Sequence, residues 1–171
     1  AKNLLDTLNE YRANFNHPPL RKEWNKLNAY EKWNRDIFIL LTAIRYYANA
    51  GDEKNIQTHI AALEKKFTPP LSTEKKKDLA HLLEAYDAIA YQYRISKNYT
   101  KALEYYAKAE TLAHENFYTM KAAAHKAIIY NLMGKYNEAY TYAETALTVF
   151  KFPPENNSHY GLIALKAELL Q

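Results

Sequence analysis

The chain has 171 residues, contains no cysteine and carries a formal net charge of +4. This length suffices for one domain with a substantial core, and the absence of cysteine excludes disulfides and thiolate metal sites. The positive charge is modest and dispersed along the sequence, whereas nucleic-acid-binding proteins concentrate basic side chains on one face. We therefore do not expect nucleic acid to be a partner.

The composition favours an all-α fold. Glycine occurs 3 times and proline 6 times, and no segment alternates apolar and polar residues as a half-buried strand does. Tyrosine is unusually frequent, with 16 copies. Several of these tyrosines fall at positions that a helical core would bury, so core packing explains them better than a ligand surface does.

The N-terminal third shows uninterrupted helical spacing. Apolar residues recur at intervals of three and four over 4–15, which predicts a helix that ends at the proline pair 18–19. The same spacing then continues through 20–47. That segment is either one long helix or two helices broken near 34–35. Residues 1–36 do not follow the repeat found further along the chain.

The remaining helices are separated by clear turn signals. A turn at 50–52 precedes a helix that ends before the proline pair 69–70, and Ser72 or Thr73 is placed to cap the next helix. That helix continues to Tyr93 and ends at the polar turn 96–98. Further helices are predicted over about 100–114, 118–133, 137–150 and 158–170.

An internal repeat is the strongest signal in the sequence. Large and small residues recur at fixed spacing before and after each turn, as in Tyr86, Ile89, Ala90 and Tyr93, followed by Ala102, Tyr106 and Ala109. A similar set returns so that Tyr99 and Tyr136 are 37 residues apart. This pattern resembles the tetratricopeptide repeat, most closely over 83–150. Repeats are expected at about 37–68, 83–116 and 120–153, with an incomplete one at 157–171.

The resemblance implies a single domain over 1–171, built as a right-handed superhelix of antiparallel helical hairpins, an αα-solenoid. One hairpin cannot bury its apolar face alone, so stacked hairpins bury one another's faces and form a continuous core. In this family the first helix of each pair lines a concave groove that accepts an extended or helical peptide. The resemblance therefore predicts a protein or peptide partner.

Carrying the family's groove positions onto this chain gives a set of candidate binding residues. They are Arg45, Asp87, Tyr91, Arg94, Lys121, His125 and Asn131, with Glu84, Ile95 and Ile128 at further groove positions. The alternative is that each is an ordinary solvated or interfacial residue. One branch of the family clamps C-terminal carboxylates with lysine and asparagine. Asp87 and Tyr91 occupy those clamp positions here, so we do not expect that function.

No catalytic machinery is recognisable. The sequence lacks a glycine-rich phosphate loop, an HExxH motif and a nucleophile elbow. Its 6 histidines include no pair at i and i+4, the spacing of a helical metal site. We therefore expect no catalytic residue, metal site or cofactor. The expected function is a non-enzymatic scaffold that binds protein, serving as the sensory or interaction region of a larger signalling or regulatory protein.

The last helix motivates an alternative function. Ile163, Leu165, Leu169 and Leu170 are expected to be exposed there, because no partner helix follows. A following domain or a second copy of the chain would cover them, so homodimerisation is the alternative; association with nucleic acid is a weaker one.

Two further features concern the compartment. The longest apolar run, over 37–41, is too short to span a bilayer. The start at Ala1 leaves the location open: cytoplasmic, or extracytoplasmic if an N-terminal signal has been removed.

Overall fold

The computed structural model describes residues 25–112, 117–149 and 157–170. Within this part of the chain every regular element is an α-helix, and no strand occurs. The predicted helix over 4–15 lies outside the described residues. The chain forms two compact units, 1–85 and 86–171, with the boundary inside helix α6. Each unit is described by itself.

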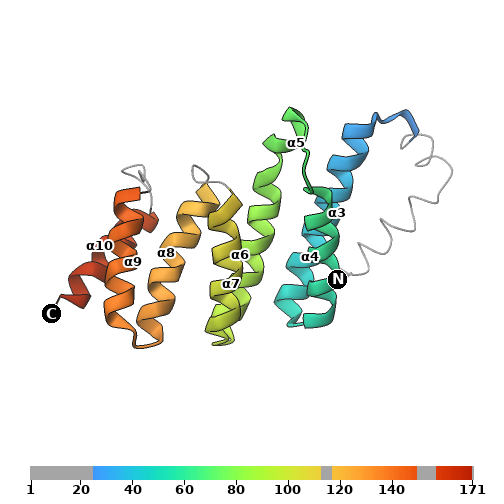
Figure 1. The fold of residues 1–171 in the computed structure, drawn as a ribbon. Helices are drawn as coiled ribbons and strands as arrows, with labels where there is room; N and C mark the ends of the chain where they lie inside the picture. Colours follow the sequence, from blue (N-terminus) through green and yellow to red (C-terminus); the bar gives the residue numbers. More distant parts are fainter. Residues whose placement is uncertain (1–24, 113–116, 150–156, 171) are drawn as a thin grey trace. The chain divides into compact units, whose positions relative to one another are not determined.

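Unit 1 is built on a hairpin of two helices, α3 (Ala29–Ala50) and α4 (Glu53–Lys66), which pack against each other (Figure 1). Asn28 caps α3 through a reciprocal capping box with Glu31, which satisfies two backbone donors that a helix start leaves free. α3 is continuous through 34–35, so the predicted break there is wrong. The described part of the segment is instead interrupted earlier, at Leu27 and Asn28, so 20–47 is not one uninterrupted helix either.

The connection after α4 differs in one respect from the prediction. Ser72 caps a helix as expected, but this helix is the short α5 (Thr73–Lys77), and α6 (Leu79–Ile95) begins only after Asp78. The Asp78 carboxylate accepts a hydrogen bond of 2.5 Å from the Tyr30 hydroxyl, which ties this residue to α3. The hydrogen bond between Asp78 and Tyr30 thus lies at the break between α5 and α6. Helical periodicity alone did not predict this break.

Unit 2 contains the rest of α6, α7 (Tyr99–Leu112), α8 (Phe117–Leu132), α9 (Tyr136–Val149) and α10 (Asn157–Leu169). Tyr105 of α7 packs against two tyrosines of α6. Each later helix packs on the one before it, and α10 also packs on α8 (Figure 1). The helix ends lie within about two residues of the predicted ones, which is the usual uncertainty at a helix terminus.

Three hairpin turns in the chain have the same backbone conformation. Gly51, Lys97 and Gly134 adopt left-handed φ angles of 68°, 61° and 73°. In each turn this residue donates its N–H to the carbonyl three positions earlier, and the next residue donates to the carbonyl five positions before itself. This arrangement is a Schellman motif, which satisfies carbonyls at the helix end. The turns are 46 and 37 residues apart, so they mark the boundaries inside three successive hairpins.

Burial follows the same register in all three hairpins. The residues five, nine and twelve positions after the left-handed residue are almost fully buried: Ile56, Ile60 and Leu63; Ala102, Tyr106 and Ala109; Ala139, Ala143 and Ala146. Five of these nine residues are alanines, which let the two helices of a hairpin approach closely. The repeated spacing read from the sequence thus corresponds to a repeated packing position in the fold.

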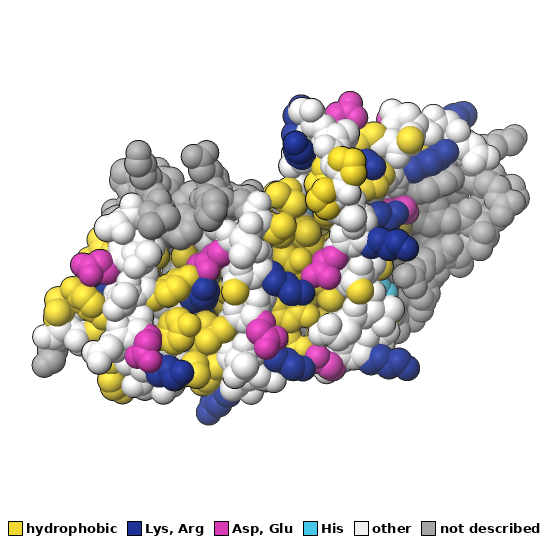
Figure 2. All heavy atoms as spheres, in the orientation of Figure 1, with side chains coloured by type: hydrophobic (Ala, Val, Ile, Leu, Met, Phe, Trp, Pro, Cys, Tyr) yellow, Lys and Arg dark blue, Asp and Glu magenta, His cyan; other side chains and the backbone are white. Residues whose placement is uncertain are grey.

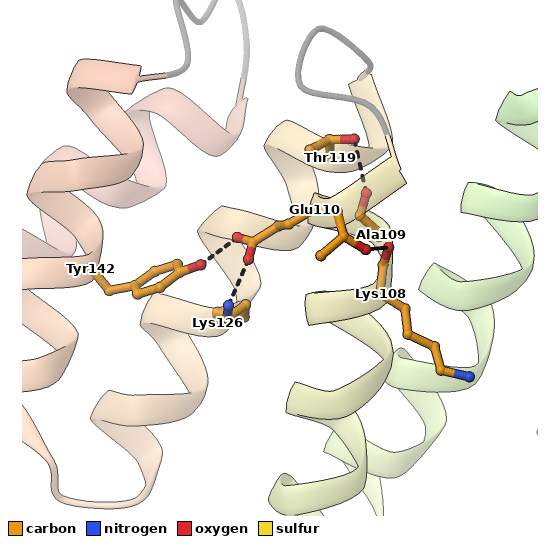
Figure 3. Close-up of polar contacts among 7 residues, drawn as sticks. Lys108, Ala109, Glu110, Thr119, Lys126 and Tyr142 are labelled. Atoms are coloured by element: carbon orange, nitrogen blue, oxygen red, sulfur yellow. Dashed lines mark hydrogen bonds and ion pairs between the residues drawn. The ribbon is translucent and has the colours of Figure 1, made fainter.

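A partly buried ionic triad connects α7, α8 and α9 (Figure 3). Lys126 Nζ lies 2.6 Å from one carboxylate oxygen of Glu110, and the Tyr142 hydroxyl donates to the other. Lys126 also lies 4.4 Å from the centroid of the Tyr142 ring. Burial and the Glu110 carboxylate raise the pKa of Tyr142, so the phenol stays protonated and continues to donate. The triad neutralises Lys126 and Glu110 where three helices meet.

The expectation for α10 was only partly right. Ile163 and Leu170 are exposed, at 46% and 70%, as expected. Leu165 is buried, so its predicted exposure was wrong, and Leu169 is partly buried. The reason is that α10 packs on both α8 and α9, and Leu162 and Leu165 enter a cluster of alanines from these two helices.

Two glycines in unit 2 provide a matched test of the hairpin turn. A Cβ atom at Gly134 would meet no atom within 4 Å, but its φ of +73° disfavours any other residue. We expect Gly134→Ala to lower the free energy of unfolding by about 1 kcal/mol. Gly161, inside α10, also has no neighbour within 4 Å, and Gly161→Ala should raise stability by up to about 1 kcal/mol.

The measurement is urea denaturation of the unit 2 transition, followed by circular dichroism. Effects of the same sign for the two substitutions would contradict a left-handed turn at Gly134.

Candidate ligand-binding surface

Five of the seven candidate binding residues lie close together in unit 2. Asp87, Tyr91 and Arg94 project from one side of α6, because residues at i, i+4 and i+7 share a helix face. Lys121 and His125 project from α8 at i and i+4. We call these five residues together with Tyr106 of α7 the α6–α8 cluster.

The centre of the cluster is a hydrogen bond between a buried tyrosine and a histidine. The Tyr106 hydroxyl lies 2.6 Å from His125 Nδ1, and the two rings meet edge to face with centroids 5.2 Å apart. Tyr106 is fully buried. A buried hydroxyl requires a partner, and this bond fixes the position of the His125 ring on α8.

Electrostatics determine which atom holds the proton in this bond. Burial, with smaller contributions from the Arg94 and Lys121 cations, lowers the pKa of His125 to about 4. Burial, followed by the Asp87 carboxylate, raises the pKa of Tyr106. The imidazole is therefore neutral and the phenol protonated near pH 7. Because Nδ1 is the one acceptor that the Tyr106 hydroxyl reaches among the described residues, we assign the O–H as the donor to Nδ1. The remaining imidazole proton is on Nε2, which makes that atom a donor.

The charged members of the cluster are only partly paired. Lys121 Nζ lies 2.6 Å from Asp87 Oδ2, which joins α8 to α6. The guanidinium carbon of Arg94 lies 5.1 Å from the centroid of the Tyr91 ring, within cation–π range. Within the described part of the chain, two buried side-chain atoms have no hydrogen-bond partner: Asp87 Oδ1 and Arg94 Nε. Such atoms are rare in folded proteins and usually meet water or a ligand.

The other two candidate residues do not join the cluster. Arg45 belongs to unit 1, where its guanidinium forms an ion pair with Glu84. Glu84 lies 37 positions before Lys121, so these two residues occupy the same position in successive repeats. Each forms an ion pair with a residue of the preceding first helix. Asn131 lies on α8 ten residues after Lys121, and its side chain takes no part in the contacts that join the other five.

Sequence reasoning missed Tyr106 as a site residue. It was assigned to the hairpin core, and its burial confirms that position. Its hydroxyl nevertheless reaches the candidate surface and orients His125. The available signal was chemical: a tyrosine at a core position must find a hydrogen-bond partner, and histidine was the polar groove residue on the following helix.

Two other classes of site were sought in the described residues. No group of three or more His, Asp or Glu side chains there is arranged to hold a metal ion. None of the helices in this part of the chain is both long and apolar enough to cross a membrane.

Comparison of the chain with family models, with curated proteins and with solved structures gave no significant match in any of the three. Membership of the tetratricopeptide family therefore stays a prediction from the repeat pattern.

The His125 environment makes a prediction about acid stability. The pKa of His125 in the folded state is about 4, below the ordinary value of 6.5. The unfolded chain therefore binds more protons between these values, and stability falls as the pH drops from 6.5 to 4. We expect His125 to contribute about 2–3 kcal/mol to this loss, and His125→Gln should flatten the pH dependence by that amount.

The measurement is the urea midpoint of unit 2 at several pH values between 4 and 7. The matched control is His81→Gln, since His81 is a partly exposed histidine in unit 1. An unchanged pH profile in His125→Gln would contradict a buried neutral imidazole.

Proposed function

We propose that the chain is a non-enzymatic scaffold of the tetratricopeptide type that binds a peptide or protein segment along the first helices of its hairpins. The observation that carries the proposal is the convergence of Asp87, Tyr91 and Arg94 from α6 with Lys121 and His125 from α8. The shared turn and shared burial register of the hairpins support a repeat array as the framework. Such a module would serve as the interaction or sensory part of a signalling protein.

A polypeptide suits this surface chemically. The α6–α8 cluster offers donors and acceptors of both charge signs, and a peptide carries N–H groups, carbonyls and side chains that match both. Exposed apolar side chains lie beside the polar groups: Tyr91 is 41% exposed and Ile95 56%. Leu132 occupies the position on α8 that Ile95 occupies on α6 and is also exposed. An amphipathic segment would find partners for both kinds of side chain.

Nucleic acid is a less suitable partner. On the face drawn in Figure 2, acidic and basic side chains are interspersed among apolar ones. The phosphate backbone of nucleic acid requires a stripe of one sign.

Self-assembly through α10 is the second candidate function. A helix that has apolar residues on two opposite sides is normally buried on both. One side of α10 is covered through Leu162 and Leu165, whereas Ile163 and Leu170 on the other side are exposed. A second copy of the chain that packed its own α10 on this side would cover both residues symmetrically.

Selection of peptides tests the leading proposal. A displayed library of random dodecapeptides is panned on the wild type and on the triple variant Tyr91→Ala, Arg94→Gln and His125→Gln. We expect the peptides enriched by the wild type to bind the triple variant at least about tenfold more weakly, which corresponds to 1.4 kcal/mol.

The matched control combines Tyr136→Ala, Arg35→Gln and His81→Gln, which change the same residue types at exposed or partly exposed positions outside the cluster. Equal binding to the cluster variant would place the site elsewhere, and a wild type that enriches no peptide would contradict peptide binding. Circular dichroism verifies that both variants are folded.

Sedimentation velocity tests the second candidate. If α10 mediates a dimer, Ile163→Glu combined with Leu170→Glu should convert it to monomer without unfolding, because both side chains are exposed. Phe38→Glu, at an exposed apolar position of unit 1, is the control and should leave the dimer intact. A monomeric wild type, or a dimer that survives the double substitution, eliminates this candidate.

A further inference from the structure

Arg94 has no carboxylate partner among the described residues, unlike three lysines of unit 2. Lys121 pairs with Asp87, Lys126 with Glu110 and Lys166 with Glu144. Arg94 is half-buried, yet none of its N–H groups is bonded to an acceptor among the described residues, and Nε is buried without a partner. A desolvated guanidinium with unused donors is energetically costly unless a partner satisfies it.

The position of Arg94 leaves its donors usable. The guanidinium carbon lies over the Tyr91 ring, 5.1 Å from the centroid. A cation–π contact of this kind uses the charge of the guanidinium and none of its N–H groups as a hydrogen-bond donor to an acceptor atom. The contact also restricts the side chain before any ligand arrives, which lowers the entropic cost of binding.

The surrounding charges favour an anion at this place. Asp87 is already neutralised by Lys121 at 2.6 Å, so Arg94 leaves the α6–α8 cluster with one positive charge in excess. The Tyr106 hydroxyl is committed to His125 Nδ1. The imidazole Nε2–H therefore remains as a second donor without an acceptor among the described residues. The repulsion expected from Asp87 toward a carboxylate is correspondingly weakened.

We propose that Arg94 binds the side-chain carboxylate of an aspartate or glutamate inside a bound peptide, with apolar residues on both sides of that acidic residue. The inference rests on the proposed function and specifies its ligand. Arginine and carboxylate form paired, charge-assisted hydrogen bonds that are stronger than neutral ones. The Nε2–H of His125 provides an additional donor beside this contact.

The neighbours of Arg94 favour an internal acidic residue over a chain terminus. Tyr91 lies one helical turn before Arg94, and Ile95 follows it directly. Both are substantially exposed, at 41% and 56%. Apolar side chains on either side of the ligand carboxylate would cover both of them, whereas a peptide that ended at the carboxylate would leave one uncovered.

The test uses three peptides: Ac-Leu-Glu-Leu-NH2, its glutamine analogue Ac-Leu-Gln-Leu-NH2, and the free acid Ac-Leu-Gln-Leu-OH. Binding is followed through the NMR signals of the Arg94 Nε–H and the His125 imidazole. We expect the glutamate peptide to shift both signals and to bind at least about tenfold more tightly than its glutamine analogue.

The protein variants separate a role in binding from a role in folding. Arg94→Gln should abolish the preference for glutamate, and Arg94→Lys should restore it in part because lysine keeps the charge but not the planar donors. Arg35→Gln, an exposed arginine on α3, is the control and should leave the preference unchanged. Unchanged positions of signals from the helix cores show that the fold is intact.

Several outcomes would overturn the inference: equal binding of the glutamate and glutamine peptides, no shift with the glutamate peptide, or a preference for the free acid, which would assign the site to chain termini. These outcomes differ from failure of the proposed function. If library peptides without a carboxylate require the α6–α8 cluster but tolerate Arg94→Gln, peptide binding stands and the carboxylate inference fails. If no library peptide requires the cluster, both fail.

Discussion

The constraint on which the structure depends is that two helices joined by a turn of two or three residues must cover each other's apolar faces. Gly51, Lys97 and Gly134 make this possible, because a left-handed residue lets the chain reverse while the last carbonyls of the first helix stay bonded. The second helix then presents buried residues, most of them alanine or aliphatic, at fixed distances from the turn. One hairpin still leaves apolar surface exposed, so in unit 2 the next helices pack against it.

Much of this framework could be predicted from sequence, because periodicity, caps and turn residues are local properties. The limits of α7 to α10 and the cap at Ser72 follow from them. Two features were not local. The break at Asp78 accompanies a bond to Tyr30, 48 residues away, and the burial of Leu165 depends on α10 contacting both α8 and α9. A helical pattern shows that a face is apolar but not how many neighbours cover it.

The sequence predicted which residues lie near one another on the candidate surface, but not which of them form ion pairs and hydrogen bonds. Repeat register places Asp87, Tyr91 and Arg94 on the same side of α6 and brings Lys121 and His125 next to them. The choice of ion-pair partners depends on side-chain rotamers and on how far each side chain extends toward the neighbouring helix. The spacing of residues along the chain does not determine either. Arg45 therefore turned out to be bonded to Glu84 within unit 1, and Tyr106 proved to orient His125 from the core.

The ion pairs determine which polar groups of the α6–α8 cluster are left without a partner among the described residues. Glu84 and Lys121 occupy the same repeat position with opposite charge, and each pairs with the preceding first helix. The charged side chain at this repeat position therefore links each first helix to the preceding one, and its charge is opposite to that of its partner. Residues engaged in this way are largely satisfied and have little left to offer a ligand. Three groups remain: Asp87 Oδ1, a buried acceptor without a hydrogen-bond partner, and two donors, the Arg94 guanidinium and the His125 Nε2–H. The two donors are the basis of our proposal that the ligand supplies a carboxylate, because the cation of Lys121 already neutralises Asp87.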